Sequence, residues 1–167
     1  FIYFGRINPI KNIDLIIKAF IDSAPSKEWI LELYGIQDDP KYLNYLISII
    51  NNSNYSNQIL IKKPVFGIKK YKIMTSAWCN VLISKSEILS LSVLESLSVG
   101  TPSIVNKNIY FPDWIKKNIF LSDIYQGSLK NSFKRIMNIS YSERIKSRKK
   151  IIKNFDKNYS ISIIKNK

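Results

Sequence analysis

The chain has 167 residues, 46% of them hydrophobic, and a formal net charge of +14. This length suffices for one domain with a sizeable core, and no apolar run approaches the roughly 18 residues of a membrane-spanning helix. With no histidine and one cysteine, Cys79, the sequence excludes an internal disulfide, a zinc site and a Ser-His or Cys-His nucleophile within the chain. The charge requires either an anionic partner or a reason to tolerate the repulsion, and the candidate partners are nucleic acid, an anionic membrane face and a phosphate-bearing small molecule.

Short apolar runs bounded by glycine, proline and asparagine predict strands along the whole chain. They are expected at residues 1–4, 29–34, 58–62, 80–84, 103–105 and 119–121. The chain opens directly on a strand, at Phe1 rather than at a methionine, so we expect it to be a piece of a longer protein.

Helical periodicity predicts a helix after each of these strands. Helices are expected at residues 12–21, 38–50, 69–77, 87–100 and 111–116, and again from Gly127 onward. This alternation with short connections predicts an α/β fold, a Rossmann-like open parallel sheet with helices on both faces. Residues 1–140 are expected to form that domain, and residues 141–167 a basic helical tail.

Small and polar residues follow the predicted strands, where open parallel sheets bind their ligands. They are Gly5, Arg6, Gly35, Pro64, Val65, residues 84–87 and Asn106. Because the carboxyl ends of parallel strands meet at one edge, these residues are expected to line a common site.

The chain is organised around residues 87–102, EILSLSVLESLSVGTP, in which only Glu87 and Glu95 are ionisable. The apolar positions of a largely buried helix are Leu91, Val93, Leu94 and Leu97. Ser90 or Ser92 can cap its start, which leaves Glu87 in the loop before it and Glu95 inside it. A buried carboxylate needs a polar partner. Alternatively, Glu95 emerges at the surface or pairs with a lysine.

Two cations, Arg6 and Lys11, flank a predicted strand-to-helix turn and can hold phosphate oxygens. They can equally be ordinary surface cations of a basic chain. A diphosphate over the helix start at Ser90 and Ser92 would meet free N–H groups, and Glu95 could accept hydrogen bonds from the vicinal hydroxyls of a ribose. A nucleoside diphosphate sugar supplies all of these features.

Several ordered motifs resemble the C-terminal half of glycosyltransferase family 4. The segment GRINPIKN, from Gly5 to Asn12, resembles its GR…KG opening, and AWCNVLISKSE, residues 77–87, is similar to its AD…PS..E strand. Glu87 and Glu95 stand at the spacing of its E-x7-E motif. GTP at residues 100–102 matches the family's turn, and residues 112–113, Pro-Asp, fall where it usually has Pro-Glu. The likeness runs from Phe1 to about Met137.

That resemblance implies the donor-binding half of a GT-B enzyme, a retaining hexosyltransferase-type glycosyltransferase whose N-terminal half binds the acceptor. Arg6 and Lys11 would hold the diphosphate without a metal ion, Glu95 the ribose and Glu87 the donor sugar. Further donor contacts are implied for Gly5, Pro64, Val65, Leu89, Ser90, Leu91 and Ser92. No cofactor is implied beyond the nucleoside diphosphate sugar, which is the donor substrate.

Three departures from the family pattern concern the donor pocket. Ile88 and Ser90 stand where the family often has glycine, and Asn12 replaces another common glycine. Asparagine tolerates left-handed backbone conformations, so the last change is mild. Bulk at Ile88 is expected to reshape the sugar pocket.

The basic tail could bind anionic lipid, or it could be a solvated helix. Its cations are Arg144, Lys146, Arg148, Lys149, Lys150, Lys153 and Lys157. Together these features favour an enzyme of surface polysaccharide synthesis that acts on a glycan or lipid-linked acceptor, in the cytoplasm or at the inner face of the membrane. The alternatives are an inactive nucleotide-sugar-binding module of the same fold and a nucleic-acid-binding domain. The latter is disfavoured because it gives Glu87 and Glu95 no role.

Overall fold

A computed structural model describes residues 1–87 and 90–159 of the chain. Its centre is a parallel sheet of six strands in the order β3-β2-β1-β4-β5-β6. The strands are β1 (Ile2–Phe4), β2 (Leu31–Tyr34), β3 (Ile59–Lys62), β4 (Asn80–Leu82), β5 (Ser103–Asn106) and β6 (Ile119–Ser122). This arrangement confirms the expected α/β, Rossmann-like sheet.

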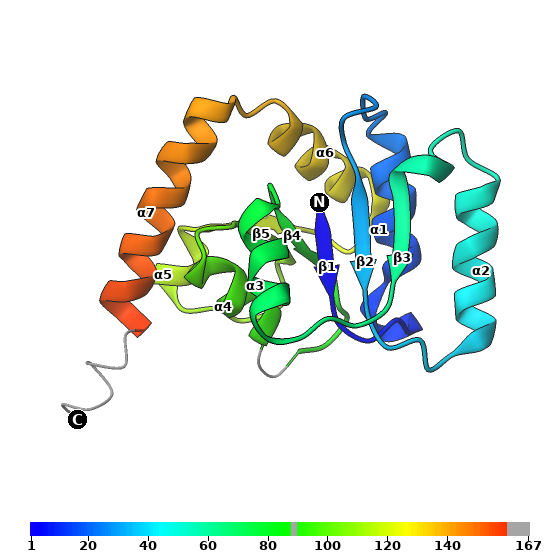
Figure 1. Cartoon of the computed structure of the whole chain (residues 1–167), viewed down its shortest axis with the longest axis horizontal. Helices are drawn as coiled ribbons and strands as arrows, with labels where there is room; N and C mark the ends of the chain where they lie inside the picture. Colours follow the sequence, from blue (N-terminus) through cyan, green and yellow to red (C-terminus); the bar gives the residue numbers. More distant parts are fainter. Residues whose placement is uncertain (88–89, 160–167) are drawn as a thin grey trace.

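Helices cover both faces of this sheet (Figure 1). They are α1 (Ile13–Asp22), α2 (Pro40–Asn51), α3 (Gly67–Ser76), α4 (Leu91–Ser98), α5 (Asp113–Lys116), α6 (Gln126–Met137) and α7 (Tyr141–Tyr159). Short 3-10 turns occupy Pro9–Lys11 and Ser56–Gln58. Among the described residues, no helix is both long enough and apolar enough to cross a bilayer.

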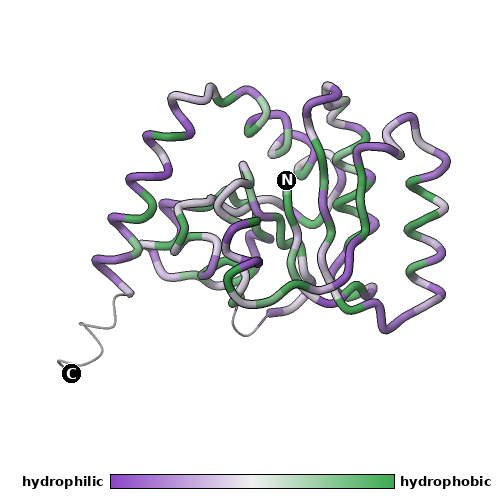
Figure 2. Tube along the Cα trace, in the orientation of Figure 1, coloured by the Kyte–Doolittle hydropathy of each residue, from purple (hydrophilic) through white to green (hydrophobic). Residues whose placement is uncertain are grey.

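Side chains of β1 alternate between the two faces, as the period of two residues requires. Phe1 and Tyr3 belong to the larger core, which includes α1, α2 and α6, whereas Ile2 and Phe4 pack with Met74 of α3. Figure 2 shows the sheet strands as mainly hydrophobic segments inside a more polar shell. Tyr3 and Phe4 therefore lie at the carboxyl end of β1 with their side chains on opposite faces of the sheet.

Most element boundaries lie within two residues of those expected from the sequence, and the clearest difference is at α4. This helix begins at Leu91 rather than Glu87. Ser90 occupies its N-cap position, but the expected capping hydrogen bond is absent, because its backbone is not in the extended region that aims a cap at the first turn. Leu91, expected in the core, is 61% exposed, since it lies at the mouth of a surface cavity while Val93 and Leu94 of the same turn are buried.

Cys79 and the tryptophans have structural roles in the core. Cys79 is fully buried, and burial raises the pKa of its thiol to about 12. Trp29, Trp78 and Trp114 are half-buried against the main core. None of these side chains lines the site described below.

The turn after α4 joins this helix to α3. Gly100 has a φ of 79°, and its N–H donates to the Leu97 carbonyl while that of Thr101 donates to the Ser96 carbonyl. These two bonds form a Schellman motif, whose left-handed position suits glycine. The Thr101 hydroxyl then donates to the Met74 carbonyl at 2.6 Å. Residues 100–101 therefore lock the ends of two helices together.

Substituting alanine at Gly100 is expected to destabilise the fold more than the same change at Gly67. Both glycines have positive φ, which costs a side chain about 1 kcal/mol. Only at Gly100 would the new Cβ collide, lying 2.5 Å from Cγ of Arg148, whereas at Gly67 it meets open space. Urea unfolding should show about twice the loss for Gly100→Ala; equal losses would contradict the packing of α7 on this turn.

Candidate functional site

A cavity of about 340 Å³ opens at the carboxyl edge of the sheet, over β1, β2 and β4. It brings together most of the residues that the sequence singled out. These are Gly5, Arg6, Lys11, Pro64, Val65, Glu87, Ser90, Leu91 and Ser92. Glu95 does not line the cavity, and Leu89 and Ile88 lie outside the described residues.

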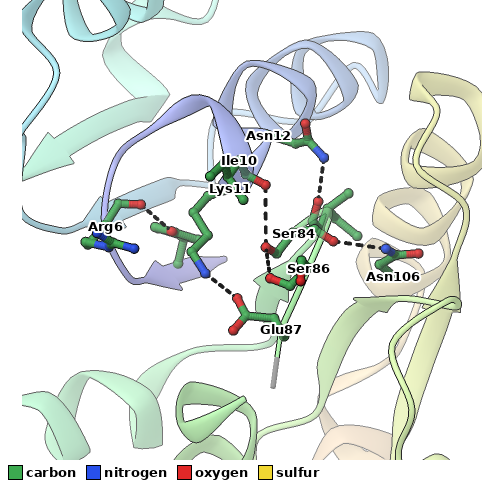
Figure 3. Close-up of polar contacts among 10 residues, drawn as sticks. Arg6, Ile10, Lys11, Asn12, Ser84, Ser86, Glu87 and Asn106 are labelled. Atoms are coloured by element: carbon green, nitrogen blue, oxygen red, sulfur yellow. Dashed lines mark hydrogen bonds and ion pairs between the residues drawn. The ribbon is translucent and has the colours of Figure 1, made fainter. Parts of the chain in front are cut away.

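The polar side of the cavity is closed by an ion pair between Lys11 and Glu87 (Figure 3). The Lys11 ammonium donates a hydrogen bond to Oε1 of Glu87. Both side chains are about 15% exposed, at 16% and 14% respectively. The cation expected to hold phosphate and the carboxylate expected to hold a sugar thus meet each other across the loops after β1 and β4.

Backbone and amide hydrogen bonds fix those two loops against each other (Figure 3). Asn12 is buried with a left-handed φ of 52°, and its Nδ2 donates to the Ile83 carbonyl at 2.8 Å. The N–H of Lys85 donates to the Ile10 carbonyl at 3.0 Å. Asn12 therefore takes the backbone conformation of the glycine it replaces and adds a bond that glycine lacks.

Arg6 is held by its backbone and leaves its exposed side chain at the cavity wall. The Tyr3 hydroxyl donates to the Arg6 carbonyl at 2.7 Å. Burial, and next the charge of Glu87, raises the pKa of Tyr3, so this phenol remains a neutral donor. Gly35 packs so closely that a Cβ there would collide with the Gly5 carbonyl oxygen. The turn at Gly5 therefore requires glycine at position 35, directly after β2.

Glu95 pairs with Lys70 of α3, as the alternative interpretation of the sequence proposed. Its Oε2 lies 2.5 Å from the Lys70 ammonium, which also lies 5.4 Å from the centre of the Phe4 ring. Lys70 lines the cavity, and its bond with Glu95 holds that carboxylate beside the cavity wall. A cation in the first turn of a helix opposes the helix dipole, and here no acidic residue shares that turn.

An aromatic platform forms the opposite side of the cavity. Phe4 and Tyr34 stack with their ring centroids 4.8 Å apart and an interplanar angle of 12°. Phe66, which follows Pro64 and Val65, lines the same space and is 73% exposed. Phe4 and Tyr34 are buried in their stack, so Phe66 is the ring of the three whose open face suits a nucleobase. Sequence reasoning missed Tyr34, Phe66 and Lys70 as site residues, although Tyr34 ends a predicted strand and Phe66 directly follows a predicted contact.

The start of α4 offers hydrogen-bond donors to the cavity. The Ser90 hydroxyl is buried and has no partner within the described part of the chain. Helix N-termini attract anions through their free N–H groups. Over the described ranges, no group of three or more histidine, cysteine or acidic side chains is placed to hold a metal ion. The cavity therefore brings two cations, Arg6 and Lys11, and the Glu87 carboxylate to the N-terminus of α4.

Residues 1–158 match the family described as Glycosyl transferases group 1. The chain belongs to this family. No curated protein is similar enough to give a match.

Solved structures of group 1 enzymes and other glycosyltransferases share the fold. The pneumococcal O-GlcNAc transferase GtfA, in complex with UDP and GlcNAc, is 19% identical with a TM-score of 0.75, and the match covers 99% of this chain and 34% of GtfA. Staphylococcus aureus TarM, in a complex that includes UDP, is 18% identical with a TM-score of 0.80, over 98% and 34% of the two chains. This glycosyltransferase group 1 chain thus spans about a third of these relatives and has the Rossmann-like fold of one GT-B half.

A separately crystallised domain matches over nearly its whole length. The C-terminal domain of the group 1 protein LpcC from Francisella tularensis is 19% identical with a TM-score of 0.78, and the match covers 96% of this chain and 85% of that domain. The likeness therefore concerns one half of the GT-B fold.

Substitutions at Asn12 are expected to separate its two contributions to the site. Asn12→Gly keeps the left-handed backbone but leaves the buried Ile83 carbonyl unpaired, at a cost of about 1–3 kcal/mol. Asn12→Ala adds backbone strain of about 1 kcal/mol or more. Urea midpoints should therefore fall in the order Asn, Gly, Ala. An alanine variant as stable as the glycine variant would show that the left-handed turn is not required.

Proposed function

We propose that this chain is the donor-binding half of a retaining, GT-B glycosyltransferase that transfers a hexose from a nucleoside diphosphate sugar. The observation that carries the proposal is the single cavity that joins Arg6 and Lys11, Glu87, the start of α4 and an aromatic platform. Family membership supports sugar transfer in general terms. Structural relatives in complexes with UDP support a nucleotide-bearing donor.

The cavity fits the parts of such a donor in sequence. The base would lie against Phe66 and the loop at Pro64 and Val65, which is the apolar side. The diphosphate would lie between Arg6 and the N-terminus of α4, where the buried Ser90 hydroxyl supplies a free donor. Ser90, a departure from the family pattern, therefore gains a role in this proposal as a donor ligand.

In the proposed reaction, the bond between the anomeric carbon and the diphosphate oxygen breaks and its electron pair leaves with the diphosphate. The acceptor hydroxyl oxygen forms the new bond to that carbon on the same face, and its proton passes to the departing phosphate oxygen. Arg6 and Lys11 offset the charge that develops there, without a resident metal ion. Lys11 already points into the cavity through its bond with Glu87, so the arriving phosphate replaces Glu87 as its partner. Glu87 is then free to accept hydrogen bonds from the sugar hydroxyls.

The acceptor, in this proposal, is a glycan or a lipid-linked glycan of surface polysaccharide synthesis. A second Rossmann-like half would bind it, as the greater length of the matched structures suggests. The enzyme would act in the cytoplasm, at the inner face of the membrane. Nucleic acid is not the proposed partner.

Calorimetric titration with UDP, GDP and ADP tests the donor site. One nucleotide, expected to be UDP, should bind selectively, and Glu95→Gln should weaken it about tenfold by removing a charged acceptor. Circular dichroism should show that both proteins are folded. Equal, weak binding of all three nucleotides that added salt abolishes would mean only a basic surface. Selective binding without transfer by the full-length protein would instead identify an inactive nucleotide-sugar-binding module.

Comparing UDP with 2′-deoxy-UDP tests whether Lys70 and Glu95 together recognise the ribose. One hydroxyl can donate to the carboxylate while it accepts from the ammonium, so Lys70→Met should bring the preference for UDP down by about tenfold. Lys69→Met is the matched control, because Lys69 is an exposed neighbour on the same helix that does not line the cavity. An unchanged UDP preference in Lys70→Met would remove Lys70 from the ribose site.

A further inference from the structure

Helix α7 presents two different cationic faces, which the sequence does not separate. Its inward face carries two arginines that are bonded to the end of α3. Arg144 donates to the carbonyls of Ser76 and Ala77 at 2.9 Å each, and Arg148 donates to that of Thr75 at 2.5 Å. Cations at the C-terminal end of a helix complement its dipole. These two arginines therefore serve the fold.

Apolar contacts complete the docking of α7 and fix its rotation about its own axis. Ile151 is buried, Phe155 packs on Trp114 with ring centroids 6.0 Å apart, and the Arg148 stem lies against Gly100. Figure 2 shows hydrophobic and hydrophilic segments alternating along the helix, as an amphipathic helix requires. With this face anchored, the opposite face is held toward solvent.

The opposite face is a row of lysines, here called the lysine face. It consists of Lys146, Lys149, Lys150, Lys153 and Lys157, all of them exposed. At 3.6 residues per turn these five positions fall within an arc of about 100°, opposite Arg148 and Phe155, and extend over about 16 Å of helix. Every exposed residue from 146 to 157 is Lys, Ser or Asp.

In the described ranges no counter-charge is paired with the lysine face, although Glu143 and Asp156 lie at its borders and Glu143 interacts with Lys146 through space. Within the described part of the chain none of its five ammonium groups has a salt bridge or side-chain hydrogen bond, although lysines elsewhere pair with Glu87, Glu95 or Asp123. Glu143, the acidic residue in the first turn, instead accepts hydrogen bonds from Ser140.

Like charges four residues apart on a helix repel each other, and this face contains three such pairs. They are Lys146 with Lys150, Lys149 with Lys153, and Lys153 with Lys157. A helix that served only to cover the core would be more stable with alternating signs on this face. A local rule broken in this way marks a surface that has an external partner.

We propose that the lysine face of α7 binds the anionic surface of a membrane. Lysine ammonium groups are strongly hydrated point charges, which suit a diffuse layer of lipid phosphates better than the paired geometry of a single bound phosphate. The face has no exposed aromatic or aliphatic side chain between residues 146 and 157, so it cannot stack bases or insert into the acyl region. The contact is therefore electrostatic and reversible.

Membrane contact through this face leaves the cavity open. Helix α7 runs along one side of the molecule (Figure 1), and none of its described residues lines the cavity. The proposal does not depend on the proposed sugar transfer, since nothing in the lysine face takes part in donor binding. The two can be tested on one protein by separate measurements.

Sedimentation with vesicles tests the lysine face. The 167-residue protein is expected to bind vesicles of phosphatidylcholine mixed with phosphatidylglycerol, but not pure phosphatidylcholine, and rising salt should release it. A variant with all five lysines of the face changed to glutamine should bind about tenfold or more weakly. The matched control changes five exposed lysines elsewhere and should lose about twofold at most. They are Lys27, Lys41, Lys69, Lys72 and Lys134.

Melting curves and UDP titration show whether both variants remain folded and whether the cavity is intact. Equal losses in the two variants would overturn the proposal, because net charge alone would then explain binding. Failure of the unaltered protein to bind anionic vesicles would also overturn it. So would a face variant that loses affinity for duplex DNA while its vesicle binding is unchanged. If the unaltered protein does not bind UDP, that result counts against the proposed donor site but does not affect the conclusion from vesicle binding.

Discussion

The contact between Lys11 and Glu87 is the point on which the site depends, because it joins two loops that are 76 residues apart in the sequence. The parallel order of the sheet makes it possible: β1 and β4 are neighbours, so their carboxyl ends open side by side. Asn12 then ties the loop after β1 to Ile83, which directly follows β4. Without this register, the two charges would face water separately and the cavity would lose the ion pair that closes its polar side.

The fold could be predicted from the sequence because its signals are local. Apolar runs of three to six residues bounded by breakers mark the strands, and Gly100 marks the end of α4 through a left-handed turn that glycine favours. Leu91 was wrongly placed in the core because periodicity gives the spacing of apolar residues, not the rotation of a short helix. That rotation is set by contacts with α3 and α7, which spacing does not contain.

The candidate site could be predicted in part. Residues directly after strands, such as Arg6, Pro64 and Glu87, were found because parallel topology sends them all to one edge. The basic cluster of Lys69, Lys70 and Lys72 is visible in the sequence near the expected base pocket, but Lys70 could not be singled out as the cavity residue because sequence offers no contrast between one lysine of the cluster and the next. The same lack of contrast grouped Arg144 with the outward lysines of α7, although its guanidinium is bonded to α3.

The bond from Thr101 to the Met74 carbonyl has a mechanical consequence. It fastens the end of α3 to the turn after α4, and the pair of Lys70 with Glu95 fastens the same helices again. Helices α3 and α4 therefore form one rigid unit, and the loops that carry Lys11 and Glu87, joined by their ion pair, form a second unit. A nucleoside would contact α3 and α4 through its ribose alone, whereas the proposed nucleotide sugar would also contact the loops that carry Lys11 and Glu87 and so link them to the two helices.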